Sequence, residues 1–367
     1  MNSEFPFFIY YLGLLILTVF LSRFIFRKYI QFAKNYNLTK SSNERAVHKG
    51  YVFTGGGVVY AAVIMVAALI LDNLDFVYFS NFSPIVATAI LVSILGFYDD
   101  FVEISPFNKY IVLTFLILML LYANATLPII KNLNGFLGIY SIGYIPGLIF
   151  TAFVYLSIMN AINLTDGIDG YLAIFSIFFF TSLLYNFDVN QFYTLNTVSV
   201  IIIGCSLMFL KYNFSKGKKL FVGDAGSLFI GFWIATYLIT YIHSAPTSKL
   251  VQLYSIQLQN IPVIAISMIS IPVLDTLRVM LVRILNKKSP FIADRNHLHH
   301  ILLDSGMSHL QTSLFLTIIN WFNCIGIFLI EQNFNSKQLT ILYIFISLFW
   351  YSFFEYLNRK NLISSKD

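Results

Sequence analysis

Long apolar runs separated by short polar connections dominate this sequence. A helix needs about 20 apolar residues to cross a bilayer core of about 30 Å. The runs of that kind predict spans at residues 5–24, 54–71, 82–98, 110–128, 144–162, 170–187, 194–211, 225–243, 258–281, 310–330 and 338–356. The predicted fold class is therefore all-α, a polytopic membrane protein with about 11 transmembrane helices. No fixed-period repeat or long linker interrupts the runs, so one membrane domain over residues 1–367 is expected, with its motifs within about 45–309.

The basic residues gather on alternate connections. Of the 23 Lys and Arg residues, all but Lys131, Lys249 and Lys337 fall on connections after odd-numbered spans or in the C-terminal tail. Positively charged connections stay in the cytoplasm, so the N-terminus is expected outside and the C-terminus inside. The run Phe5–Ser22 has no basic segment before it and no small-residue cleavage site, which favours a retained span over a signal peptide.

Composition supports a membrane protein and excludes several other classes. Hydrophobic residues make up 58% and charged residues 11% of the chain, with a mean hydropathy of +0.76, whereas soluble domains carry about 25% charged residues. The net charge of +6 reflects topology, because no basic patch is interleaved with a stacking platform, and nucleic acid is not expected as a partner. Cys205 and Cys324 lie in apolar runs and form neither a disulfide framework nor a zinc site.

Two Gly-rich clusters predict places where backbone amides meet an anion. One runs from Lys49 to Gly55-Gly56-Gly57, where the second span begins, and the other, Phe221-Val-Gly-Asp224-Ala-Gly-Ser227, opens the eighth span. Glycine permits close backbone approach, and a helix N-terminus favours anions. Lys49 would add a point charge, and Asp224 could carry a metal. A plain connecting loop and an acidic N-cap are the simpler alternatives.

Paired carboxylates end the third span. Asp99 and Asp100 are adjacent, and Lys109 follows before the next span. Such a pair can bind a cation or accept a proton. Solvated acidic residues at a helix end would need no partner, and that alternative stays open.

A polar stripe ends the fifth span, formed by Asn160, Asn163, Asp166 and Asp169. These residues recur every three positions, so wherever the segment is helical they share one face. An apolar span that ends in oxygen-rich side chains fits a hard cation and a sugar. A purely structural stripe is the alternative.

Histidines concentrate in the connection after the ninth span. Arg295, His297, His299 and His300 lie within the run Asp294-Arg-Asn-His-Leu-His-His300 and could clamp a diphosphate. They could also hold zinc, but no thiolate lies near and the carboxylates elsewhere suit a harder metal. A surface loop with incidental histidines is the remaining alternative.

Together and in this order, these motifs resemble the polyprenyl-phosphate N-acetylhexosamine-1-phosphate transferases. The resemblance covers the chain from His48 to His300. It implies that Asp224 is the principal Mg²⁺ ligand, with Asn163 as a second and Mn²⁺ as a substitute ion. It also implies that Phe221 packs on uracil. Phosphates would be neutralised by Lys49, Lys109, Arg295 and His299.

The same resemblance assigns the catalytic roles. The carboxylates it marks as catalytic or supporting are Asp99, Asp100, Asp166 and Asp169, and the histidines it marks as needed for activity are His297 and His300. Asp99 is either a proton acceptor or a covalent nucleophile in this comparison. The segment Ser215–Lys219 departs from the family, which usually has a Pro-Ala-Arg-like stretch there, so nucleotide contacts in that segment stay open.

The spacing of the histidines indicates which sugar nucleotide is the donor substrate. His297-Leu-His299-His300 is similar to the branch that uses UDP-GlcNAc and related sugars, and differs from the peptidoglycan branch with three consecutive histidines, which disfavours UDP-MurNAc-pentapeptide. The implied partners are a UDP-N-acetylhexosamine, undecaprenyl phosphate, membrane lipid and a second copy in a homodimer. The implied location is the bacterial inner membrane, with the active site on the cytoplasmic face.

Two other functions fit parts of the pattern. A transporter or flippase for a lipid-linked sugar would also need many spans with polar residues, but it predicts midplane sites and related half-repeats. This sequence places its polar clusters at one face and shows no second copy of them. An assembly scaffold predicts that the carboxylates are expendable.

Overall fold

The computed structural model describes residues 4–40, 52–73, 82–123, 127–186, 193–215, 217, 219–287 and 297–364. The chain forms two compact units, and each is assembled from separate stretches of sequence. The first contains Met1–Leu127 and Leu172–Ile234, and the second contains Pro128–Tyr171 and Ala235–Asp367. A single domain over residues 1–367 stays a prediction.

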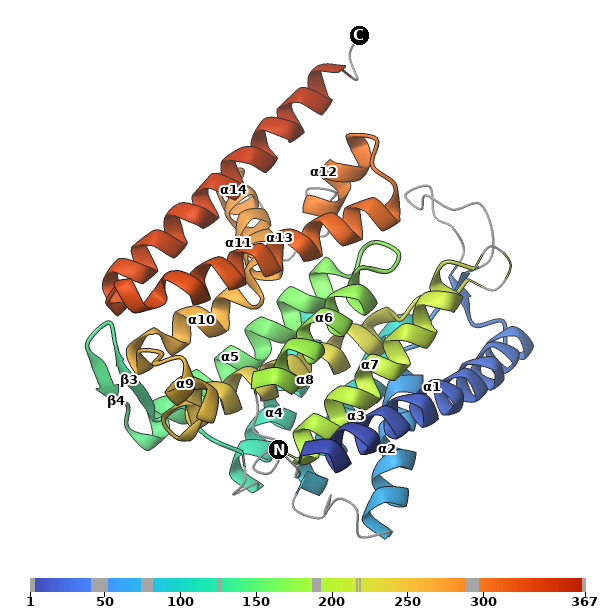
Figure 1. Ribbon diagram of the computed structural model, residues 1–367. Coiled ribbons are helices and arrows are strands. Elements are labelled where there is room, and N and C mark those ends of the chain that lie inside the picture. The colour runs from blue at the N-terminus through green and yellow to red at the C-terminus, as the bar shows by residue number, and fades with distance from the viewer. Residues whose placement is uncertain are drawn as a thin grey trace. The chain divides into compact units, whose positions relative to one another are not determined.

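The first unit is a bundle of apolar helices. Its elements are α1 (Glu4–Asn35), β1 (Thr39–Lys40), β2 (Val52–Phe53), α2 (Val58–Asn73), α3 (Ser83–Val102), α4 (Pro106–Ala123), most of α6 (Tyr171–Asn186), α7 (Tyr193–Asn213) and the first half of α8 (Gly223–Ser244). In Figure 1, α1 runs alongside α7, and α2 packs against α1, α3 and α7. Strands β1 and β2 pair antiparallel.

Aromatic side chains fill the core where α1, α2 and α7 meet. The ring of Phe26 lies 6.3 Å from Tyr60, 6.0 Å from Phe209 and 5.5 Å from Tyr212, measured between ring centroids. Each of these four residues is at most 7% exposed. Aromatic pairs at such distances add to the stabilisation from burial, so this cluster joins the three helices.

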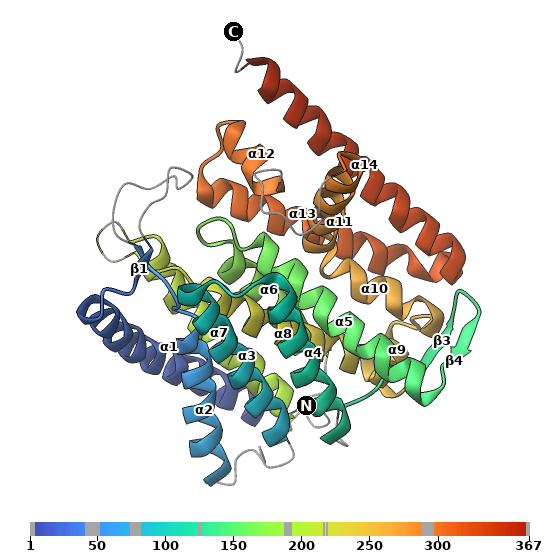
Figure 2. The same ribbon diagram turned by 180° about the vertical axis from the view of Figure 1, so that it is seen from behind.

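The second unit combines helices with one hairpin. Its elements are β3 (Asn132–Phe136), β4 (Ile139–Ser141), α5 (Tyr144–Thr165), the end of α8, η2 (Ala245–Thr247), α9 (Lys249–Leu253), η3 (Leu258–Asn260), α10 (Ile261–Ser267), α11 (Ser270–Leu285), α12 (Leu298–Asp304), α13 (His309–Ile330), η4 (Glu331–Asn333) and α14 (Ser336–Ser364). The antiparallel β3–β4 hairpin lies beside η3 and α10, which Figure 2 shows from behind.

The predicted span 258–281 is broken rather than continuous. Leu258–Ser267 and Ser270–Leu285 are bent by 70°. The amide side chain of Asn320 on α13 satisfies backbone groups freed at the break, because its Nδ2 donates to the Met268 carbonyl at 2.8 Å and its Oδ1 accepts from the Ile271 N–H at 3.0 Å. A helix break inside a membrane is tolerated only where such partners exist.

The described helices confirm an all-α chain with several apolar spans. Eight of them are long and apolar enough to cross a membrane, and the bent pair could form a ninth. The shorter apolar helices Val58–Asn73 and Tyr171–Leu184 coincide with two further predicted spans. The count of eleven and the orientation of the termini therefore stay predictions. Among the eight, the most apolar stretch of α8 is 94% buried and that of α14 only 11% buried, which leaves most of the apolar surface of α14 to face lipid.

Candidate active site

The two Gly-rich motifs lie side by side in the first unit. The Phe53 carbonyl accepts from the Phe221 N–H at 2.8 Å, and the Phe53 N–H donates to the Lys219 carbonyl at 3.1 Å. Further along, the Gly56 N–H donates to the Phe221 carbonyl at 3.0 Å, and the Gly57 N–H donates to the Val222 carbonyl at 2.8 Å. The segment that precedes α2 therefore pairs in parallel with the one that leads into α8.

Glycine is required where three helices converge on this segment. A Cβ on Gly57 would overlap the backbone of Gly226, and a Cβ on Gly96 would overlap the backbone of Asp224. Neither position could hold a side chain without moving the backbone of α8. The glycines thus bring the starts of α2 and α8 and the end of α3 to one place.

A lysine joins two of the predicted site carboxylates. The Nζ atom of Lys109 lies 2.9 Å from Oδ2 of Asp99 and also forms a short ion pair with Oδ2 of Asp224. The side chains of Lys109 and Asp99 are 14% and 12% exposed, whereas that of Asp224 is 32% exposed. Asp99 is held further by its Oδ1, which accepts from the Ile104 N–H at 2.6 Å. The structure thus brings three of the predicted site residues, Asp99, Lys109 and Asp224, to one place.

Asp100 has a different environment from its neighbour. It is 4% exposed, and its carboxylate accepts from the backbone N–H groups of Asp224 at 3.1 Å and Ala225 at 3.4 Å. A Cβ on Gly223, whose φ is +69°, would overlap this carboxylate. Asp100 therefore caps the N-terminus of α8 and orients Asp224. This contact gives Asp100 a positioning role, in addition to the catalytic role that the sequence suggested.

The predicted uracil-binding ring lies beside a lysine. Phe221 is half-buried, and Lys219 Nζ lies 5.4 Å from the centroid of its ring. This cation–π contact belongs to the Lys-rich segment that departs from the family pattern. Of the other predicted binding residues, Lys49 and Arg295 lie outside the described residues.

The polar stripe belongs to the second unit, and only half of it is helical. Asn163 lies in the last turn of α5, which also includes Asn160, and Asp166 is the residue that ends the helix. Asp169 lies in the turn before α6, where its N–H donates to Nδ1 of His309 at 3.3 Å, and its Oδ2 lies 3.4 Å from the same atom. The helical periodicity therefore holds for the two asparagines, and Gly167 and Gly170 redirect the chain after them.

The three predicted histidines cluster at the start of α12. The rings of His297 and His299 are stacked with centroids 5.6 Å apart, and the ring of His300 lies 4.3 Å from that of His299. A Cβ on Gly167 would overlap the His299 ring, so this glycine is needed for the turn after α5 to approach α12. His299 is 3% exposed.

The pKa of His299 is lowered well below its ordinary value. Burial is the largest cause, and the positive charge that the three neighbouring histidines can carry adds to it. His299 is consequently neutral near pH 7 and can serve as a hydrogen-bonding group rather than as a fixed cation.

Two further residues of this cluster, Asp275 and His309, were not among the site residues predicted from the sequence. Asp275 on α11 has its Oδ2 3.0 Å from His297 Nδ1, and His309 at the start of α13 contacts Asp169. A lone carboxylate within a predicted span was a usable signal for Asp275, because such residues are rare unless paired. No comparable signal singled out His309, which begins a helix next to a polar turn.

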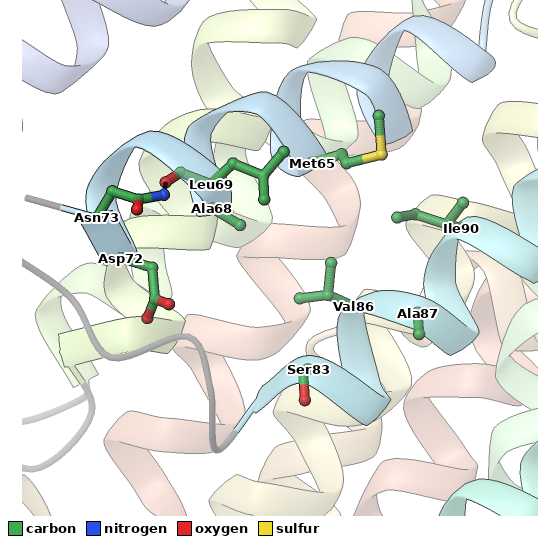
Figure 3. A pocket seen from close by; sticks show the side chains of 9 residues that line it. All are labelled: Met65, Ala68, Leu69, Asp72, Asn73, Ser83, Val86, Ala87 and Ile90. Carbon is green, nitrogen blue, oxygen red and sulfur yellow. Dashed lines mark hydrogen bonds between the residues drawn. The ribbon is translucent and has the colours of Figure 1, made fainter.

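A separate cavity of about 270 Å³ lies between α2 and α3. Figure 3 shows apolar side chains of the two helices facing each other, with the polar Asp72, Asn73 and Ser83 at one end. These three residues belong to the end of α2 and the start of α3, whereas Gly57 precedes α2 and Asp99 belongs to the last turn of α3. The cavity is therefore remote along both helices from the Lys109 ion pairs.

Comparison with known proteins agrees with these motifs. A family model described as Glycosyl transferase family 4 matches residues 82–242. A Bacillus subtilis (strain 168) protein, named probable undecaprenyl-phosphate N-acetylglucosaminyl 1-phosphate transferase, is 27% identical over 73% of this chain and 71% of its own length. The Escherichia coli (strain K12) undecaprenyl-phosphate alpha-N-acetylglucosaminyl 1-phosphate transferase is 28% identical over 78% and 74%. The Mycobacterium leprae decaprenyl-phosphate N-acetylglucosaminephosphotransferase is 27% identical over 74% and 72%.

Proposed function

We propose, from this similarity to glycosyl transferase family 4, that the chain transfers N-acetylglucosamine 1-phosphate from UDP-N-acetylglucosamine to undecaprenyl phosphate, releasing UMP. The names of three similar proteins support a polyprenyl phosphate acceptor and an N-acetylglucosamine phosphate group. The reaction would begin the synthesis of a cell-surface polysaccharide. The transporter is not favoured, because these relatives are named as transferases.

The observation that carries the proposal is the pair of contacts made by Lys109. Its ammonium joins Asp99 at the end of α3 to Asp224 in the first turn of α8. The site thereby combines two carboxylates and one ammonium with the N-terminus of the 22-residue helix α8. Positioned charge of this kind suits phosphoryl transfer, where catalysis is mainly orientation and electrostatic stabilisation.

The donor set fits Mg²⁺, with Mn²⁺ as a substitute. The side-chain oxygens of Asp224 and Asp99, which share Lys109, are hard ligands. This matches how Mg²⁺ is usually held, by one or two carboxylates with substrate phosphates and water. When bound, the ion would neutralise phosphate charge and stabilise the leaving UMP. Asn163, the second proposed ligand, belongs to the other unit.

The protein groups then act on two phosphates. A phosphate monoester has a second pKa near about 6, so the acceptor is already mostly dianionic at neutral pH and needs little base catalysis. One of its oxygens would attack the sugar-proximal phosphorus while the bond from that phosphorus to UMP breaks, and UMP leaves with the electron pair. Lys109 would reduce the repulsion between the two phosphates, and Asp99 would orient Lys109 and the acceptor. Phe221 would stack on uracil.

The second unit would contribute the remaining catalytic groups. These are Asp166, Asp169, His297 and His300, which the resemblance marks as catalytic, with His299 as a neutral hydrogen-bonding neighbour of the two histidines. We place the protein in the bacterial inner membrane with eleven spans, its N-terminus outside and its C-terminus and active site on the cytoplasmic side. The charge asymmetry of the connections supports this orientation. A homodimer is a further expectation from the family.

Transfer of radiolabel from UDP-GlcNAc to undecaprenyl phosphate tests the proposal. Wild-type protein should label lipid only with Mg²⁺ or Mn²⁺, and Asp224→Asn should lose about 100-fold or more of the activity. Asp72→Asn, at the rim of the remote cavity, is the matched control and should retain activity. Absence of lipid labelling with any UDP-sugar would contradict the proposed function. Exchange of UMP into UDP-sugar without lipid would replace direct displacement by a covalent Asp99 intermediate.

A further inference from the structure

Asp275 connects the broken helix to the histidine cluster. It is 2% exposed and lies in the second turn of α11, after the bend. Its Oδ1 accepts from the backbone N–H of Leu298 at 2.9 Å, and its Oδ2 lies 3.0 Å from Nδ1 of His297. One carboxylate thus contacts the first residue of α12 and the histidine that precedes it.

The two contacts leave little freedom in how His297 is protonated. A carboxylate can only accept a hydrogen bond, so the short distance to Nδ1 requires the proton on that nitrogen. Stacking on His299 restrains the plane of the same ring. Nε2 is then the ring atom that remains for an external group, as in carboxylate–histidine pairs that orient a ligand or a base.

Other charged or titratable groups surround this pair. His299 and His300 come from the same helix, and His309 acts electrostatically on His299. Tyr171 lies within electrostatic reach of Asp275. Arg278, one turn further along α11, pairs with Glu355 of α14 at 2.5 Å. Among the residues that the structure describes, Asp275 is the carboxylate that contacts His297, whereas Asp169 contacts His309.

We propose that Asp275 is a positioning residue of the transferase: it fixes His297 as the Nδ1-protonated tautomer and directs Nε2 toward a phosphate oxygen of the substrates. This inference rests on the proposed function for the nature of the substrate, but the tautomer itself does not depend on it. Asp275 touches no reacting atom and acts through His297.

The substitution Asp275→Asn tests this with little change in shape. Its Oδ1 can still accept from the Leu298 N–H, but its Nδ2 would donate to His297 Nδ1 and so move the ring proton to Nε2. We expect kcat to fall roughly 10- to 100-fold, the usual cost of removing a partner that orients a ligand or base, while KM and thermal unfolding change little. Asp275→Glu, which keeps the acceptor, should restore part of the activity.

Nitrogen NMR of ¹⁵N-histidine-labelled protein in lipid vesicles reports which ring nitrogen of His297 carries the proton. A purely structural role of Asp275 would leave that tautomer unchanged in the variant. The chain has six histidines, and His297→Gln identifies the signal of His297. Wild type should show Nδ1–H at neutral pH, and Asp275→Asn should show Nε2–H. Thr276→Val is the matched control, because Thr276 Oγ1 is buried without a hydrogen-bond partner in the described part of the chain; it should leave both tautomer and kcat unchanged.

The outcomes separate the two proposals. Wild-type protein that carries Nε2–H on His297 overturns the inference even if transfer is robust. Full kcat in Asp275→Asn despite a reversed tautomer also overturns it. If wild type transfers no sugar phosphate, the proposed function fails, while the NMR comparison still decides whether Asp275 sets the tautomer.

Discussion

Lys109 Nζ lies 2.9 Å from Asp99 Oδ2, although ten residues separate the two along the chain. Asp99 belongs to the last turn of α3 and Lys109 to the first turn of α4, so the short connection between the helices folds one onto the other. The same ammonium pairs with Asp224. Two carboxylates from different helices therefore share one positive charge.

Replacing this ammonium should abolish most transfer. In Lys109→Met the carboxylates of Asp99 and Asp224 lose their shared partner, and the phosphates lose a fixed positive charge. We expect kcat/KM to fall about 100-fold or more in the radiolabel transfer assay. Lys131→Met removes a lysine from an exposed position in the second unit and is the matched control. Comparable activity in the two variants would show that Lys109 has no part in the reaction.

The glycine contact between α2 and α8 should be intolerant of a methyl group. Gly57→Ala places a Cβ against the backbone of Gly226, which cannot give way as a flexible side chain would. We expect a loss of about 1–3 kcal/mol in stability, typical of overpacking, measured by thermal unfolding in detergent. Gly13→Ala is the control, because a Cβ there meets nothing within 4 Å and the residue lies within a helix. Equal effects at the two positions would rule out close approach as the cause.

The helical, apolar character of the chain was predictable because bilayer thickness imposes one length on every span. The break after Ser267 was not, because its freed backbone groups are satisfied by Asn320, a residue about 50 positions away. Likewise, the sequence marked both Gly-rich motifs as phosphate sites, but nothing local showed that residues 52–57 would pair with 219–222. Such pairing depends on side-chain packing between distant helices.

Some of the site residues were likewise predictable from the sequence, and others were not. Asp99, Lys109 and Asp224 stood out because acidic and basic residues are scarce in this chain, and the structure brings these three together. Asp275 was overlooked since it lies inside an apolar run, with its partner His297 more than 20 residues later. Adjacent residues can also differ in role: Asp100 contacts backbone amides at the start of α8, a distinction that the pair Asp99-Asp100 does not reveal.

The proposed orientation can be tested at the two ends of α14. Lys337 and Lys360 are exposed near opposite ends of this helix, and the topology places the first outside and the second in the cytoplasm. Lys337→Cys in intact cells should react with a membrane-impermeant maleimide, whereas Lys360→Cys should react only after permeabilisation. The native Cys205 and Cys324 are both buried, so background labelling should be low. The reverse pattern would invert the topology and place the site on the outer face.

The buried histidine predicts how stability depends on pH. Because the pKa of His299 is lowered in the folded protein, the unfolded chain binds more protons than the folded one once the pH drops below the ordinary value of about 6.5. Stability should therefore be constant above that pH and decline below it, by up to about 1.4 kcal/mol per pH unit for one such group. His299→Gln cannot bind the proton in either state. Unfolding of wild type and variant at pH 7, 6 and 5 should show the wild type losing more stability on acidification. Parallel curves for the two proteins would mean that His299 is readily protonated in place, which would remove the argument for a neutral ring between His297 and His300.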